Sequence, residues 1–246
     1  MNPAPLKTLI LLLACAATLV CHPAFPAPTL VLNSFYSSPL TSPEKDGFLD
    51  LLYQELALRT GIPIEIQSLP GERALMNANS GVNDGDVSRI AGLEKQYPNL
   101  VMVPEQVIHL QMAVFTRNAD FTVAGLASLQ PYDVGIVTGW KILERSIVGT
   151  HSRMTVATGE QLFMMLDSNH IDIAVIERIQ GRQMIRRMAL KNIRELQPAF
   201  LATDYYLYLN KKHADLVPIL AAELKKMKAD GTSQRLYKDV MDHYAE

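Results

Sequence analysis

Cysteine is almost missing from this chain of 246 residues, and its two cysteines, Cys15 and Cys21, both lie near the N-terminus. If that segment is removed on export, disulfides, cysteine nucleophiles and thiolate metal sites are excluded together. The six histidines show no metal-ligand spacing, and the HExxH, GxSxG and phosphate-loop motifs are missing. The sequence therefore predicts no metal site and no cofactor.

An excess of charge of one sign is also missing. The chain has 23 Lys and Arg against 25 Asp and Glu, a formal net charge of −2. A nucleic-acid-binding surface would need a clustered basic face, so we expect no nucleic-acid partner. Hydrophobic residues make up 48% of the chain, which is enough to bury a core.

Long hydrophobic runs are rare, and the clearest one lies at the N-terminus. Lys7 precedes an apolar stretch from Leu9 to Val20, and small residues and prolines follow it. This order is typical of a secretory signal peptide, and the run is shorter than the roughly 20 residues of a membrane-spanning helix. We expect residues 1–27 to be a cleaved signal peptide and the mature chain to be periplasmic. Leu12–Cys15 loosely resembles a lipoprotein box, so lipidation is the less favoured alternative.

Strands and helices alternate in the first part of the mature chain. Short apolar runs rich in β-branched residues predict strands, and apolar stripes at helical spacing predict helices between them. This alternation indicates a sheet with crossover helices. The strands are expected at Thr29–Asn33, at Ile64–Gln67 and near Val87, and the helices at Phe48–Thr60, ended by Gly61, and at Glu72–Ser80.

The middle of the chain repeats this alternation, and two further strands bracket it. Thr158 and Gln161 form a capping box ahead of an apolar helix. The bracketing strands are candidates for two crossings between lobes. The expected strands are Asp133–Val137, Ile171–Ile176 and the bracketing Met112–Arg117 and Tyr205–Leu209. Helices are expected to begin near Trp140, at Leu162, after a cap at Asp215 and after a cap at Thr232 or Ser233.

The order helix, breaker, aspartate and strand occurs twice, around Asp84 and around Asp172. This weak repeat suggests two lobes built on similar plans. Together with the bracketing strands, it predicts that residues 28–118 and 202–246 form lobe 1 and that residues 119–201 form lobe 2.

Short motifs occur in a fixed order along nearly the whole mature chain: Asp46-Gly47-Phe48, Ser80–Gly85, Asp133–Gly139, His170–Ile176, and Met227–Gly231 followed by Leu236-Tyr237. In order and spacing they resemble the extracellular solute-binding proteins of the amino-acid type, family 3. The resemblance implies an α/β, periplasmic-binding-protein-like fold of the second type, with two lobes joined by two hinge strands. It also implies a monomeric binding protein, not an enzyme, that delivers a small, amino-acid-like, carboxylate-bearing solute to the membrane permease of an ABC transporter.

The binding positions depart from the family pattern. Gln96 stands where the family has an arginine that grips the ligand carboxylate, and Arg89 comes earlier. Gly139-Trp140 replaces the glycine-threonine clamp, and Glu177 aligns with the aspartate that binds the ligand ammonium. These departures put an ordinary α-amino-acid ligand in doubt.

Three charged residues are candidates for ligand binding. Arg89 follows a strand end in the crevice where open α/β sheets bind ligands, and its planar fork suits a carboxylate or phosphate; the alternative is a surface arginine paired with Asp86. Arg73 lies at a helix start, where anions are favoured, or is simply solvated there. Glu177 is a cation-binding acid, unless neighbouring arginines neutralise it.

The remaining candidates are aromatic or short and polar. Trp140 either walls the cleft and stacks on a ligand or packs the turn. Phe35 and Tyr36 end the first strand, where the family places aromatic cleft residues. Ser88 is a candidate hydrogen-bond donor, although short polar residues are common at strand ends.

Two other functions stay open at this point. The same fold includes a periplasmic cyclohexadienyl dehydratase, for which Glu177 could act as a cleft acid. The chain could also be a ligand-sensing module that acts through a separate membrane receptor. Turnover of prephenate or arogenate separates the first alternative from a binding protein, and neighbouring permease or kinase genes separate transport from sensing.

Overall fold

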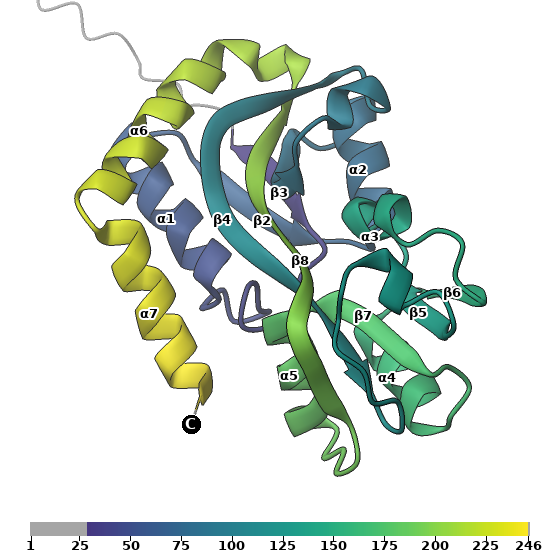
Figure 1. Ribbon diagram of the computed structural model, residues 1–246. Helices are drawn as coiled ribbons and strands as arrows, with labels where there is room; N and C mark the ends of the chain where they lie inside the picture. Colours follow the sequence, from purple (N-terminus) through teal and green to yellow (C-terminus); the bar gives the residue numbers. More distant parts are fainter. Residues whose placement is uncertain (1–28, 246) are drawn as a thin grey trace, which may run out of the picture.

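The computed structural model describes residues 29–245 (Figure 1). The predicted signal peptide, residues 1–27, lies outside the described residues together with Cys15 and Cys21. Within the described part of the chain, no helix combines the length and the apolar character needed to cross a bilayer.

Eight strands form a continuous sheet in the order β2-β1-β3-β8-β4-β7-β5-β6. A parallel three-stranded unit lies at each end, and a central antiparallel pair, β4 and β8, joins the two units. The strands are β1 (Leu30–Ser34), β2 (Ile64–Ser68), β3 (Gly85–Ile90), β4 (Leu100–Thr116), β5 (Asp133–Val137), β6 (Ser152–Val156), β7 (Ile173–Glu177) and β8 (Arg194–Asn210).

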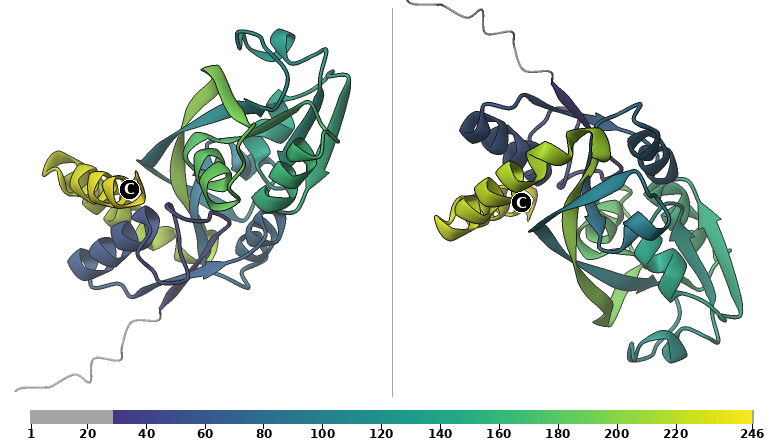
Figure 2. Two further views of the ribbon diagram at one scale, coloured as in Figure 1. Left: turned by 90° about the horizontal axis from the view of Figure 1, so that it is seen from below. Right: turned by 90° about the horizontal axis from the view of Figure 1, so that it is seen from above.

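Helices cover both units of the sheet. Helices α6 and α7 return to pack beside α1, and α6 also contacts β4 (Figure 2). We call β1–β3 with α1, α2, α6 and α7 the first half, and β5–β7 with α3, α4 and α5 the second half. The helices are α1 (Phe48–Thr60), α2 (Gly71–Ser80), α3 (Lys141–Ser146), α4 (Gly159–Asp167), α5 (Arg178–Arg187), α6 (Val217–Ala229) and α7 (Thr232–Ala245), with short 3-10 turns η1 (Leu93–Lys95), η2 (Leu126–Ser128) and η3 (Lys211–Leu216).

The two long strands, β4 and β8, have 17 residues each and run through both halves (Figure 1). The α/β fold with two crossing strands is therefore confirmed. The sequence indicated only the most apolar part of each crossing, because β4 also carries Pro104 and His109, which are exposed, and several half-buried positions. Of the predicted lobe boundaries, residue 118 lies just after β4 and residue 202 lies within β8. The boundaries themselves stay a prediction.

The end of α1 and the beginning of α4 follow their sequence signals. The stripe of Leu49, Leu52 and Leu56 on α1 is fully buried, and Gly61 ends this helix with a φ of 70°. Glycine suits this left-handed position because it has no Cβ. Thr158 caps α4, and its side chain accepts a hydrogen bond from the backbone N–H of Gln161.

One strand was missed, and one expected helix cap was wrong. The edge strand β6 was not predicted, because its Ser-Arg-Met-Thr-Val sequence is largely exposed and lacks an apolar alternation. Asp215 does not cap the following helix. Instead, the side chain of Asn210 accepts from the N–H of Lys212 and opens η3, and α6 then begins with Pro218 in its first turn.

Candidate functional site

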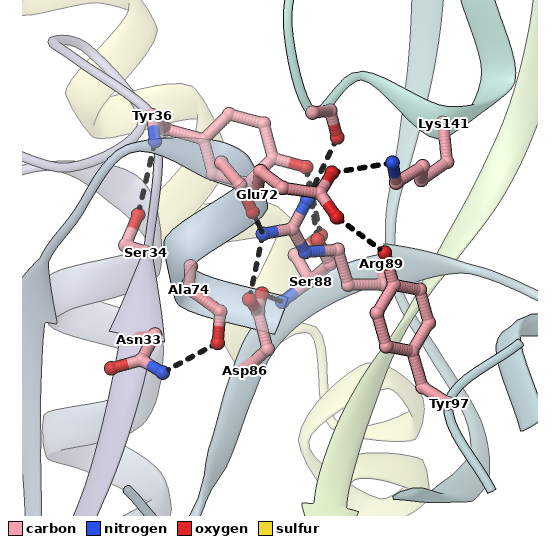
Figure 3. A network of polar contacts seen from close by, with 12 residues as sticks. Asn33, Ser34, Tyr36, Glu72, Ala74, Asp86, Ser88, Arg89, Tyr97 and Lys141 are labelled. Atoms are coloured by element: carbon pink, nitrogen blue, oxygen red, sulfur yellow. Dashed lines mark hydrogen bonds and ion pairs between the residues drawn. The ribbon is translucent and has the colours of Figure 1, made fainter. Parts of the chain in front are cut away.

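Five of the seven predicted ligand-binding residues gather between the two halves. Phe35 and Tyr36 follow β1, Ser88 and Arg89 lie on β3, and Trp140 follows β5. The residues of β1 and β3 meet because these strands are parallel neighbours, whose carboxyl ends lie at the same edge of the sheet, where open α/β folds place their ligands. Trp140 comes from the carboxyl end of β5 in the second half and contacts them across the interface. Figure 3 shows the polar part of this cluster.

The three aromatic rings contact one another. The Phe35 ring centroid lies 4.3 Å from that of Tyr36 and 5.0 Å from that of Trp140, and the last two rings are perpendicular at 5.6 Å. The two contacts of Trp140 are edge-to-face, an arrangement that aromatic pairs favour. The Tyr36 hydroxyl donates to the backbone oxygen of Ser88 at 3.1 Å, and burial raises the pKa of Tyr36 well above its usual value. Trp140 therefore both packs the turn and walls the interface.

The Arg89 guanidinium is buried, and both of its terminal nitrogens have partners, whereas its Nε has none among the described residues. It lies 2.8 Å from Asp86 Oδ2 and donates to the backbone oxygens of Gly71, at 2.9 Å, and Gly139, at 3.1 Å. It also sits 3.9 Å above the Phe35 ring, a cation–π contact. The pairing with Asp86, left open by the sequence, is thus present. Because Gly71 belongs to the first half and Gly139 follows β5 in the second, Arg89 ties the halves together.

A second polar contact between the halves was missed by sequence reasoning. Lys141 at the start of α3 forms ion pairs with Glu72 on α2 and, at 2.8 Å, with Glu144. The hydroxyl of Tyr97 donates to Glu72 at 2.9 Å. Burial disfavours the charged form of Lys141, but hydrogen bonds to Glu144 and Glu72 outweigh it and raise the pKa of Lys141 above its usual value. In the sequence, Glu72 directly precedes Arg73 and Lys141 directly follows Trp140. This position beside predicted site residues is the signal that could have identified them.

Glu177 is buried and caps α5. Its two carboxylate oxygens accept from the backbone N–H groups of Ile179, at 3.0 Å, and Gln180, at 2.9 Å. Burial raises the pKa of Glu177 to about 7. The neighbouring Arg178 and Arg182 form ion pairs with Glu195 instead. The structure thus gives Glu177 a helix-capping role that the sequence reasoning did not foresee.

A cavity of about 280 Å³ lies between the halves, beside the aromatic cluster. Ser37 reaches across it and donates to Gln180 Oε1 at 3.4 Å, and Nε2 of the buried Gln180 has no partner among the described residues. The hollow beside Arg89 is far smaller, about 10 Å³. The cavity is lined by Phe35, Ser37, Ser68, Leu69, Pro70, Val137, Trp140, Ala157, Thr158, Gly159, Glu160, Ile176, Gln180 and Met184.

Two other hollows, and Arg73 as the last of the predicted residues, lie outside this cavity. Hollows of about 350 Å³ and 530 Å³ lie near the junction of β4 with α7 and beside β6, and none of the predicted residues lines them. Arg73 is exposed on α2 and lines neither these nor the central cavity. We therefore regard the 280 Å³ cavity as the candidate site, with Gln180 and Ser37 as residues that the sequence did not indicate.

The halves meet backbone to backbone at Gly139, which has a φ of +91°. A Cβ there would lie 2.7 Å from backbone atoms of Gly71 and Glu72. We expect Gly139→Ala to lower the free energy of unfolding by about 2–4 kcal/mol, from backbone strain together with the clash. Gly149→Ala is the matched control, because Gly149 has a φ of +71° but no atom within 4 Å of the added Cβ. Equal losses in urea denaturation of the two variants would contradict this close contact.

No family model matches the chain. It is 28% identical over 216 residues to an uncharacterized protein of Shewanella oneidensis, covering 85% of this chain and 80% of that protein.

Solved structures share its fold at low sequence identity. A histidine kinase sensor domain with similarity to periplasmic binding proteins is 17% identical, with a TM-score of 0.72 over 87% of this chain and 96% of that chain. An amino acid ABC transporter substrate-binding protein, AbpA from Streptococcus pneumoniae, bound to L-arginine, is 15% identical, with a TM-score of 0.71 over 88% and 95%. An ancestral arginine-binding protein bound to arginine is 16% identical, with a TM-score of 0.71 over 87% and 99%. The chain therefore has the type II periplasmic-binding-protein fold, which amino-acid-binding proteins and sensor domains share.

Proposed function

We propose that this chain is an exported solute-binding protein that holds a small polar solute between its two halves and passes it to an ABC permease. The cavity of about 280 Å³ carries the proposal, since it combines the Phe35 and Trp140 rings with the unpartnered amide of Gln180. A cavity that combines apolar and aromatic walls with a few convergent polar groups is a usual form of a small-molecule site. Two crossing strands are a suitable hinge for closure around it.

We propose binding rather than catalysis because of what Glu177 does. An enzyme that eliminates water and carbon dioxide needs a carboxyl group facing its substrate, whereas both Glu177 oxygens are engaged by backbone N–H groups of α5. Incubating the purified protein with prephenate or arogenate tests this point directly. Formation of a product would overturn the proposal.

A true ligand is expected to stabilise the protein and make it more compact. A ligand that binds only the native state raises the free energy of unfolding by about 2.7 kcal/mol at a hundredfold excess over its dissociation constant. A thermal-shift screen of small solutes identifies such a ligand, and small-angle scattering reports closure. Scattering profiles that are identical with and without a saturating ligand would contradict hinge closure.

The proposed location and partner need separate tests. N-terminal sequencing of the chain recovered from the periplasm should begin near residue 28 if the leader is cleaved as predicted. The likeness to a sensor domain keeps signalling as the second candidate function. Deleting the gene should abolish uptake of the identified solute if the chain serves a permease, and should change only the transcriptional response to that solute if it serves a receptor.

A further inference from the structure

The buried positive charge beside the cavity, Arg89, is already neutralised. Arg89 and Asp86 are three residues apart on β3, with side-chain exposures of 3% and 0%. The second acceptor of Arg89, the Gly71 oxygen, also belongs to the first half. Of the contacts that neutralise and satisfy this guanidinium, only the one to Gly139 would be lost if the halves separated. The hollow of about 10 Å³ beside Arg89 holds no more than about one water molecule.

The negative charges near the cavity are also engaged. Glu160 is the one ionisable side chain among the described residues that line it, and it is ion-paired with Arg187. Burial opposes ionisation of Glu160, but hydrogen bonds from its own backbone N–H and from Arg187 outweigh it and lower its pKa. Glu177, just behind the wall, caps α5 with both oxygens. A bound ammonium or carboxylate would therefore have to compete with an existing ion pair or hydrogen bond for a counter-charge at the wall.

The polar group of the cavity wall that lacks a partner is neutral. Nε of Arg89 is also buried without a partner in the described part of the chain, but Arg89 lines the hollow of about 10 Å³ and not the cavity. Gln180 is 4% exposed, its Oε1 accepts from Ser37, and its Nε2 has no partner within residues 29–245. A buried amide without a partner is unfavourable, so a ligand acceptor placed there would gain from both its own contact and the relief of that penalty. The rest of the wall combines apolar and aromatic side chains with hydroxyl groups at Ser68 and Thr158 and the carboxylate of Glu160.

Building on the proposed function, we infer that this site takes an uncharged, partly apolar solute with a hydrogen-bond acceptor, and not an amino acid or other carboxylate. Enclosing an unpaired charge in a closing, water-poor cavity is strongly unfavourable. An amide or hydroxyl compound meets no such penalty, and its oxygen can accept from Gln180 Nε2. The solute class thus differs from the carboxylate-bearing class that the sequence predicted.

Two matched series of compounds test the inference by titration calorimetry and thermal shift. The first comprises 3-phenylpropanamide, 3-phenylpropanoate, L-phenylalanine and 3-phenylpropylamine; the second comprises hexanamide, hexanoate, L-norleucine and hexylamine. We expect the amide of at least one series to bind at least about tenfold more tightly than its charged counterparts. Tighter binding of a carboxylate or amino acid would overturn the inference and leave the proposed function standing. Binding of none of these compounds would count against both.

A pair of glutamine variants tests the contact itself. Gln180→Met keeps the size of the side chain but removes the amide, and it should weaken amide binding about threefold to tenfold. Gln54→Met is the matched control, because Gln54 is exposed on α1 and donates only to the Lys45 backbone oxygen. Amide binding that is equally strong in Gln180→Met and wild type would overturn the assignment of this donor.

Discussion

Replacing Arg89 with alanine is expected to lower the free energy of unfolding by about 3–5 kcal/mol. The reason is that Asp86, which is fully buried, would lose its ion-pair partner and keep an uncompensated charge or bind a proton. Burial already raises the pKa of Asp86, and Arg89 is the main group that opposes this shift. The backbone oxygens of Gly71 and Gly139 would also lose their shared donor. Urea denaturation at neutral pH measures the loss.

The double variant Arg89→Met with Asp86→Leu separates the ion pair from packing. Exchanging both members of a buried pair for apolar side chains is often neutral or stabilising, so much of the stability should return. If Arg89 instead gripped an anionic ligand in an otherwise solvated cleft, Arg89→Ala would leave stability nearly unchanged and weaken affinity for that ligand. Stability within about 1 kcal/mol of wild type would therefore contradict the role that we assign to Arg89.

Much of the fold could be predicted from local patterns because its core elements carry strong local signals. Helix α1 has a fully buried leucine stripe and a glycine stop, and β5 and β7 are short apolar runs. The edge strand β6 could not be predicted in this way, because it buries little of its side-chain surface. Pairing with β5 along one side holds it in the sheet. The lengths of the crossing strands β4 and β8 depend on pairing with each other, which no local window contains.

The candidate site was predictable only where residues follow strand ends. Phe35 and Trp140 were found because each follows the carboxyl end of a strand, and Arg89 because it lies near the carboxyl end of β3, which is parallel to β1. Contacts between the halves were not found, since the Lys141–Glu72 pair joins residues 69 positions apart and the Gln180–Ser37 bond joins residues 143 apart. These contacts form where one half closes on the other, and no sequence motif marks the residues that make them.

Stability should depend on pH through Glu177. Burial raises its pKa from 4.5 to about 7, so the folded state binds more protons than the unfolded state between these values. The free energy of unfolding should therefore fall as the pH rises from about 4.5 to 7, by on the order of 3 kcal/mol from this group. The contribution is fully present below the lower value and lost above the higher one. Urea denaturation at intervals between pH 4.5 and pH 8 gives the slope.

Glu177→Gln isolates this contribution from those of other buried acids. Asp50 and Asp86 also have raised pKa values because they are buried, and they remain in the variant. The glutamine has no titrating group, but its NH2 cannot accept a hydrogen bond, so one of the two N–H groups that Glu177 satisfies loses its own oxygen. The variant should therefore lose some stability at pH 5 yet show a shallower fall towards pH 8. Glu65→Gln on the exposed side of β2 is the control and should keep the wild-type slope. Parallel curves for Glu177→Gln and wild type would show that the cap is ionised throughout this range, because a carboxylate that stays charged contributes no pH dependence there.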